Sequence, residues 1–263
     1  AWRFVRRTPE PARGHLLGTF GLASSALVLL IAAALGAWAR FGLGYTDEER
    51  RLDAARKDYG PRECLLAAGV GDGSAFRACA PTGSGPAVLL WGDSHANHWR
   101  PAIEASAGRL GASVSVLTMN GCRPLPGPVG SKECADFNLH VMQQIGEWQA
   151  RHGLTGIVMA ARWPDGTGPV PPSLRHAMAW KPGRFYDPRA TTQEQAMTHM
   201  YEGLEAIADL AARHQLRVLI IGPSPMQRFD AAHCLAVRRE KDCAVSADAM
   251  STYAAPSLRV LER

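Results

Sequence analysis

The stretch AVLLWGDSHANHWR, residues 87–100, decides the fold of this chain. Its first residues are apolar and are bounded by Gly-Pro on one side and Gly92 on the other, which predicts a short buried strand rather than a helix. Gly92 would permit the tight turn into the helical pattern that follows. Ser94 then lies at the carboxyl edge of a strand and at the start of a helix, where ligands collect and backbone N–H groups point outward. The alternative is that Asp93 and Ser94 only cap the helix.

Strands and helices alternate after that stretch. Further strands are predicted at 113–118, 156–161 and 217–222, and helices at 99–110, 135–152, 191–215 and 246–262. Such an alternation predicts a mostly parallel sheet with helices on both faces. Residues 163–188 are rich in proline and show little periodicity, which indicates a long loop that is either functional or disordered.

Three motifs follow predicted strands: Gly-Asp-Ser-His at 92–95, Asn-Gly-Cys-Arg-Pro-Leu at 120–125 and Val-Met-Ala-Ala-Arg-Trp at 158–163. Together they resemble the SGNH hydrolase superfamily. They are most similar to the SGNH domains fused to the C-terminus of multi-pass membrane acyltransferases that O-acetylate bacterial surface polysaccharides. The resemblance extends from about Tyr59 to the end of the chain. It implies a flavodoxin-like three-layer α/β/α fold, preceded here by one transmembrane helix.

The resemblance also implies roles for residues in these motifs. Ser94 would be the nucleophile, and the backbone N–H groups of Ser94 and Gly121 would form an oxyanion hole. A glycine at 121 would let the backbone approach a bound acyl group closely. The alternative for Gly121 is an ordinary Asn-Gly turn.

The third oxyanion donor departs from the family pattern. Family members carry an Asn after the third strand, whereas this chain reads Ala-Arg-Trp at 161–163. Arg162 would then donate from the same edge, Trp163 would stack on a sugar ring and His98 would contact the ligand. The alternatives are that Arg162 pairs with an acid, that Trp163 packs under the long loop and that His98 lies on the helix surface.

The general base is not identified by the sequence. The superfamily carries Asp-x-x-His after a fifth strand, and this chain has that spacing only at Asp230 and His233, which follow the fourth predicted strand. Our hypothesis is that the chain is cut short and that the true Asp/His pair lies beyond Arg263. Asp230 and His233 remain the alternative pair. We predict no metal site, because the neighbouring residues 95–98 would not converge on one ion.

The six cysteines form three close pairs: Cys64 with Cys79, Cys122 with Cys134, and Cys234 with Cys243. Six cysteines allow fifteen connectivities, so the pairing is inferred from proximity. We predict three disulfides formed in an oxidising compartment, and the alternative is free buried thiols in a cytosolic protein.

The N-terminal part predicts a membrane segment. Residues 1–15 are basic and read as a cytoplasmic segment, whereas 16–39 carry no charge and as a helix would extend about 36 Å, enough for a hydrocarbon core of about 30 Å. Residues 40–85 are predicted as a linker helix and a Cys-stapled loop, and 86–263 as the SGNH-like domain, truncated at its C-terminus. The family resemblance implies a missing membrane acyltransferase part upstream of Ala1, and a lone anchor is the alternative.

The predicted function follows from these parts. A mild net charge of +5 without a concentrated basic stripe argues against nucleic-acid binding. We expect an acyl (acetyl) transferase domain in the periplasm, attached to the bacterial inner membrane, that acylates a polysaccharide such as the O-antigen of lipopolysaccharide. It would need no cofactor of its own, because the membrane part would use an acyl donor such as acetyl-CoA. The alternatives are a carbohydrate esterase or deacetylase and a non-catalytic glycan-binding module.

Overall fold

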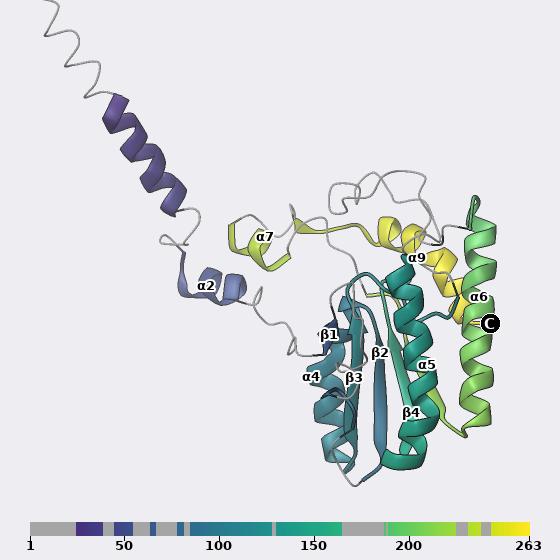
Figure 1. Ribbon diagram of the computed structural model, residues 1–263. Helices are drawn as coiled ribbons and strands as arrows, with labels where there is room; N and C mark the ends of the chain where they lie inside the picture. The colour runs from purple at the N-terminus through teal and green to yellow at the C-terminus, as the bar shows by residue number, and fades with distance from the viewer. Residues whose placement is uncertain are drawn as a thin grey trace, which may run out of the picture.

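The computed structural model describes residues 25–38, 45–54, 64–66, 78–81, 85–127, 130–164, 187, 189–224, 231–237 and 243–263 (Figure 1). The strands are β1 (Leu65–Leu66), β2 (Ala87–Gly92), β3 (Ser113–Met119), β4 (Leu154–Ala160) and β5 (Arg217–Ile221). The labelled helices are α2 (Asp47–Ala54), α4 (Ser94–Arg109), α5 (Lys132–His152), α6 (Gln193–Arg213), α7 (Ala231–Val237) and α9 (Ala247–Leu261), and residues 25–38 are also helical.

The strands form one sheet in the order β1-β3-β2-β4-β5, and every neighbouring pair is parallel. In chain order, β2 to β5 occupy the first four places of the flavodoxin-like order 2-1-3-4-5, so the predicted parallel α/β sheet is confirmed. β1 is an addition beside β3, within the segment predicted as a surface loop. Two residues are too few to show a strand period, which is why the sequence did not reveal β1.

Helices cover both faces of the sheet. Successive strand residues point to opposite faces, so Leu89 and Trp91 enter one core and Leu90 the other. The first core is filled by side chains of α5, α6 and α9, and the second lies under α4. In Figure 1, α5 and α6 run along the sheet and α9 lies beside α6. Each large side chain buried in these cores contributes about 1.5–3 kcal/mol.

Gly92 ends β2 for a reason other than the predicted one. Its backbone is not in the left-handed region, so the turn itself does not demand glycine. A Cβ on residue 92 would instead lie 1.8 Å from the carbonyl oxygen of Ala160 and 2.8 Å from the Cβ of Ala96. Glycine is therefore required because β2 passes so close to β4 and to α4.

Only part of the predicted N-terminal membrane segment lies within the described residues. Of the apolar segment 16–39, residues 25–38 form a helix whose large apolar side chains are exposed, including Leu29 and Leu30. Among the residues that the structure describes, no helix combines the length and the hydropathy needed to cross a bilayer. The helix predicted in the linker is α2, which begins with a capping box between Thr46 and Glu49.

Candidate functional site

Three strand ends meet at one edge of the sheet. Gly92 at the end of β2 is in register with Thr118 of β3 and with Ala160 of β4. Because all three strands are parallel, the segments that follow them leave the sheet on the same side. The structure thus brings the turn at Ser94, the turn at Gly121 and the segment at Arg162 to a common edge.

Asp93 ties two of these segments together. Its side chain is 3% exposed, and its two carboxylate oxygens accept hydrogen bonds from two backbone N–H groups. One bond, of 2.7 Å, comes from His95 and caps α4; the other, of 2.9 Å, comes from Arg162 after β4. Hydrogen bonds to a charged acceptor are stronger than neutral ones, so this carboxylate fixes the turn that carries Ser94. The sequence indicated the cap and missed the link to Arg162.

Ser94 is the first residue of α4 and is half-buried. The first-turn N–H groups of a helix lack helical partners, and the helix dipole makes this end attractive to negative charge. Within the described ranges the Ser94 hydroxyl has no hydrogen-bond partner. The capping alternative therefore holds for Asp93 and not for Ser94, whose hydroxyl is left at the start of the helix.

Gly121 lies in the turn that ends β3. The Cys122 N–H donates to the carbonyl of Met119 at 3.0 Å, and Gly121 has a φ of 65°, in the left-handed region. A Cβ there would meet nothing within 4 Å, so the backbone conformation rather than crowding calls for glycine. The same open space leaves the exposed backbone of residue 121 accessible to a ligand.

The segment after β4 corrects one prediction. Trp163 is fully buried in the larger core, and its Nε1 donates to the carbonyl of Ile221 at 2.7 Å. The indole ring therefore has no free face for a sugar, and the predicted stacking role is wrong. Arg162 uses its backbone N–H on Asp93, and its half-buried side chain remains the part that would serve a ligand.

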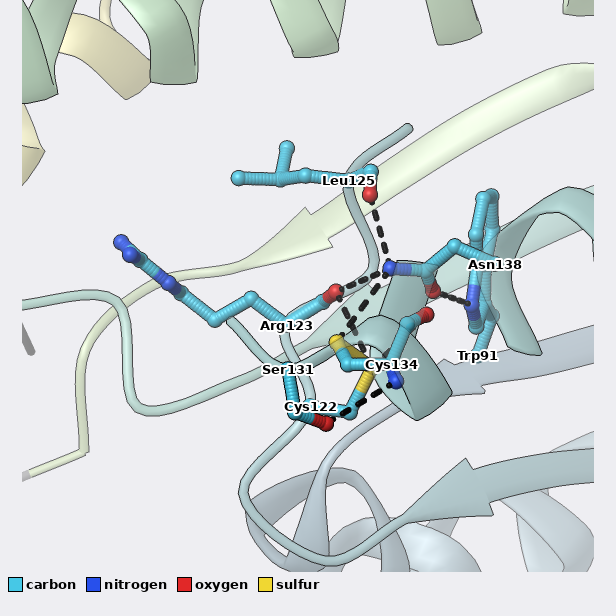
Figure 2. Close-up of a disulfide and its surroundings, with 7 residues drawn as sticks. All are labelled: Trp91, Cys122, Arg123, Leu125, Ser131, Cys134 and Asn138. Carbon is cyan, nitrogen blue, oxygen red and sulfur yellow. Dashed lines mark hydrogen bonds between the residues drawn. A yellow bond between two sulfur atoms is a disulfide. The ribbon is translucent and has the colours of Figure 1, made fainter. Parts of the chain in front are cut away.

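A buried polar network supports the loop that follows Gly121 (Figure 2). The carboxamide of Asn138 in α5 donates to the carbonyls of Arg123 and Leu125 and accepts from the indole of Trp91 in β2. Arg123 itself is 3% exposed, and its guanidinium donates to the carbonyl of Trp163 at 3.4 Å. Trp91, Arg123 and Leu125 belong to the quoted motifs, but no sequence motif pointed to Asn138 or to this network. The available signal was an Asn among apolar residues at helical spacing in α5.

The histidines after Ser94 form a pair. The ring centroids of His95 and His98 are 5.9 Å apart, and His98 is exposed. Although His98 reaches the surface, neighbouring protein atoms displace water from part of its ring, and this desolvation, together with the neighbouring His95, lowers the pKa of His98 below its ordinary value. His98 is therefore mostly neutral at pH 7 and able to accept a hydrogen bond from a sugar hydroxyl. In the described part of the chain, no cluster of three or more metal-ligating side chains is present.

A second buried carboxylate, Asp187, precedes α6 in the chain and contacts His199 of that helix. Asp187 accepts a bidentate pair of hydrogen bonds from Arg189 and lies 2.7 Å from the Nδ1 of His199. Burial opposes its ionisation, but the hydrogen bonds and charge of Arg189 outweigh that effect and lower the pKa of Asp187. Asp230 and the side chain of His233, the predicted alternative base pair, lie outside the described residues.

All three predicted disulfides are present. They join Cys64 to Cys79, Cys122 to Cys134, and Cys234 to Cys243. The first joins the residue before β1 to Cys79, whose carbonyl accepts a hydrogen bond from Ser115 of β3, and the second closes the loop after Gly121. Pairing by proximity therefore succeeded for each bond.

A family model described as "SGNH domain (fused to AT3 domains)" matches residues 54–263. The chain belongs to this family. Membership supports an acyl-transferring or esterase-type role and an associated acyltransferase part. Comparison with curated protein sequences finds no match. Among solved structures, the periplasmic domain of the lipopolysaccharide acetyltransferase of Salmonella ser. Paratyphi A is similar at 14% identity and a TM-score of 0.43. That match covers 69% of this chain and 60% of the other.

Proposed function

We propose that this SGNH domain transfers acyl groups outside the cytoplasm, through an ester on Ser94, to hydroxyls of a cell-surface polysaccharide such as O-antigen. The Ser94 oxygen would attack the acyl carbonyl, lose its proton to a base and expel the donor's leaving group. A sugar hydroxyl would then attack the ester, surrender its proton and restore the Ser94 hydroxyl. Both steps pass through an oxyanion that needs fixed N–H donors.

The observation that carries this proposal is the shared sheet edge. The Ser94 hydroxyl stands at the start of α4, the Gly121 backbone follows the neighbouring strand, and Asp93 fixes the first turn rigidly. A Ser hydroxyl beside fixed amides suits acyl transfer, whether the acceptor is a sugar or water. We assign Arg162 as a further donor to the oxyanion and His98 as a ligand contact from the same edge.

The setting outside the cytoplasm rests on separate observations. The three disulfides favour an oxidising compartment, and the exposed apolar side chains of 25–38 favour a surrounding lipid phase. The family description supports an acyltransferase part. We therefore propose that residues 16–39 anchor the domain on the periplasmic side of the inner membrane, and that the membrane part uses a donor such as acetyl-CoA.

The general base is proposed to come from a further strand beside β5. In a parallel sheet both faces of a strand are normally covered, yet Val218 is 38% and Leu219 57% exposed in β5. An additional strand and its connection would cover them and would deliver an Asp/His pair to the edge that holds Ser94. Replacing His233 with Ala tests this assignment: loss of acyl transfer with an intact fold would instead identify Asp230 and His233 as the pair.

The central test is Ser94→Ala in the full chain within its membrane. We expect loss of polysaccharide acylation, measured as ester-linked acetyl by proton NMR. Ser106→Ala is the matched control, because Ser106 lies on the exposed side of the same helix and its hydroxyl contacts only a helix carbonyl. Retained acylation in Ser94→Ala would refute a serine ester.

Two alternative functions, glycan binding without catalysis and ester hydrolysis, predict different experimental results. The lack of a hydrogen-bond partner for the Ser94 hydroxyl, within the described ranges, favours a non-catalytic glycan-binding domain as the second candidate. It predicts full acylation in Ser94→Ala and no labelling of Ser94 by a fluorophosphonate. An esterase would instead release free acid from an acyl donor equally with and without added oligosaccharide.

A further inference from the structure

We infer that Asn138 is a positioning residue for the oxyanion hole, because its side chain joins β2, which leads into the turn at Ser94, to the loop that follows Gly121. This inference rests on the proposed function of these two residues. Asn138 lies in α5, 0% exposed, and touches neither the reacting atoms nor solvent.

Both polar atoms of the Asn138 carboxamide, Nδ2 and Oδ1, form hydrogen bonds with buried groups (Figure 2). Its Nδ2 donates to the Arg123 carbonyl at 2.8 Å and to the Leu125 carbonyl at 2.7 Å. Its Oδ1 accepts from the Nε1 of Trp91 at 3.1 Å. The two carbonyls demand donors and the indole demands an acceptor, so only one orientation of the amide satisfies all three groups.

The partners lie on the two arms of the proposed site. Trp91 is in β2, three residues before Ser94, and is fully buried. Arg123 is two residues after Gly121, in the loop whose disulfide at Cys122 also anchors it to α5. Asn138 thus sets the spacing between β2 and the loop, and with it the position of the Gly121 N–H relative to the Ser94 oxygen.

No other side chain reproduces this link. Asp has no amide donors for the two carbonyls, and Leu fills a similar volume with no polar atoms at all. Asp would still accept from the Trp91 indole but would give the two carbonyls no N–H donor, whereas Leu would leave the indole N–H without its acceptor as well. In both variants the loop relaxes to recover hydrogen bonds. An oxyanion donor displaced by such a relaxation stabilises the transition state less and affects substrate binding little.

The test compares kcat and KM for a soluble acyl ester, p-nitrophenyl acetate, in the full chain purified in detergent. We expect Asn138→Leu to lower kcat about 10- to 100-fold, less than the roughly 100- to 1,000-fold for complete loss of one oxyanion donor because the Gly121 N–H is displaced and not removed, with KM changed less than about twofold. Val141→Ala is the matched control: Val141 lies on the same buried face of α5 and contacts the same core. It should lower the melting temperature comparably and leave kcat unchanged.

A double-mutant cycle separates positioning from general loss of packing. Trp91→Phe removes the indole N–H from Asn138 and should lower kcat by a smaller factor. Trp91→Phe with Asn138→Leu should then be no slower than Asn138→Leu alone, because the link is already broken. Multiplicative effects, or an Asn138→Leu enzyme with normal kcat, would overturn the inference. If Asn138→Leu does not fold, a normal kcat in Trp91→Phe overturns it. Activity in Ser94→Ala would instead refute the proposed function.

Discussion

Replacing Asp93 with Asn tests the link between the Ser94 turn and the segment after β4. Asn caps helices about as well as Asp, so the bond from His95 can be kept by the amide oxygen. The other position then carries an NH₂ group that faces the N–H of Arg162, and the 2.9 Å hydrogen bond is lost. A hydrogen bond to a charged group contributes about 1.5–3 kcal/mol, and a negative charge at a helix N-terminus about 0.3–1 kcal/mol. The expected destabilisation is therefore about 2–4 kcal/mol.

The measurement is thermal unfolding of the full chain in detergent, followed by circular dichroism. For a domain of this size about 2–4 kcal/mol corresponds to a fall in Tm of roughly 5–15 °C. The control is Ser131→Asn, which exchanges one good cap for another at α5, where Ser131 caps only its own helix. It should change stability by less than about 0.5 kcal/mol. If Asp93→Asn is as stable as Ser131→Asn, the link to Arg162 contributes nothing and the reasoning about Asp93 fails.

Three further predictions concern neighbouring features. Gly121→Ala should cost about 1–2 kcal/mol, because alanine is strained at a φ of 65°; an unchanged urea midpoint would contradict this. Cys122→Ser with Cys134→Ser should lower stability by about 2–4 kcal/mol in urea melts, and reductant should then have less effect on the variant than on the native chain. Asp187 has a folded pKa below its unfolded value of about 3.9, so its contribution is complete above that pH and is lost as the pH falls through the folded value. Asp187→Asn should therefore be less stable than the native chain at pH 7 and converge with it as the pH falls below the folded pKa of Asp187, and a gap independent of pH would refute this.

The strands could be predicted because their signal is local. The apolar runs beginning at Ala87 and Gly156, bounded by turn residues, indicate buried parallel strands by themselves. The gathering of Ser94 and Gly121 at one edge followed from parallel strand direction alone. The cysteine pairs could also be matched from sequence, because each closes a short loop.

What the sequence determined by itself was therefore the α/β alternation, the disulfide pairing and the residues at the strand ends. Only the tertiary structure showed that Gly92 is required by the carbonyl of Ala160, and that Trp163 is a core residue. It alone joined Asn138 to β2 and to the loop after β3. Each of these facts depends on atoms that are close in space and far apart along the chain, which no local pattern of side chains encodes.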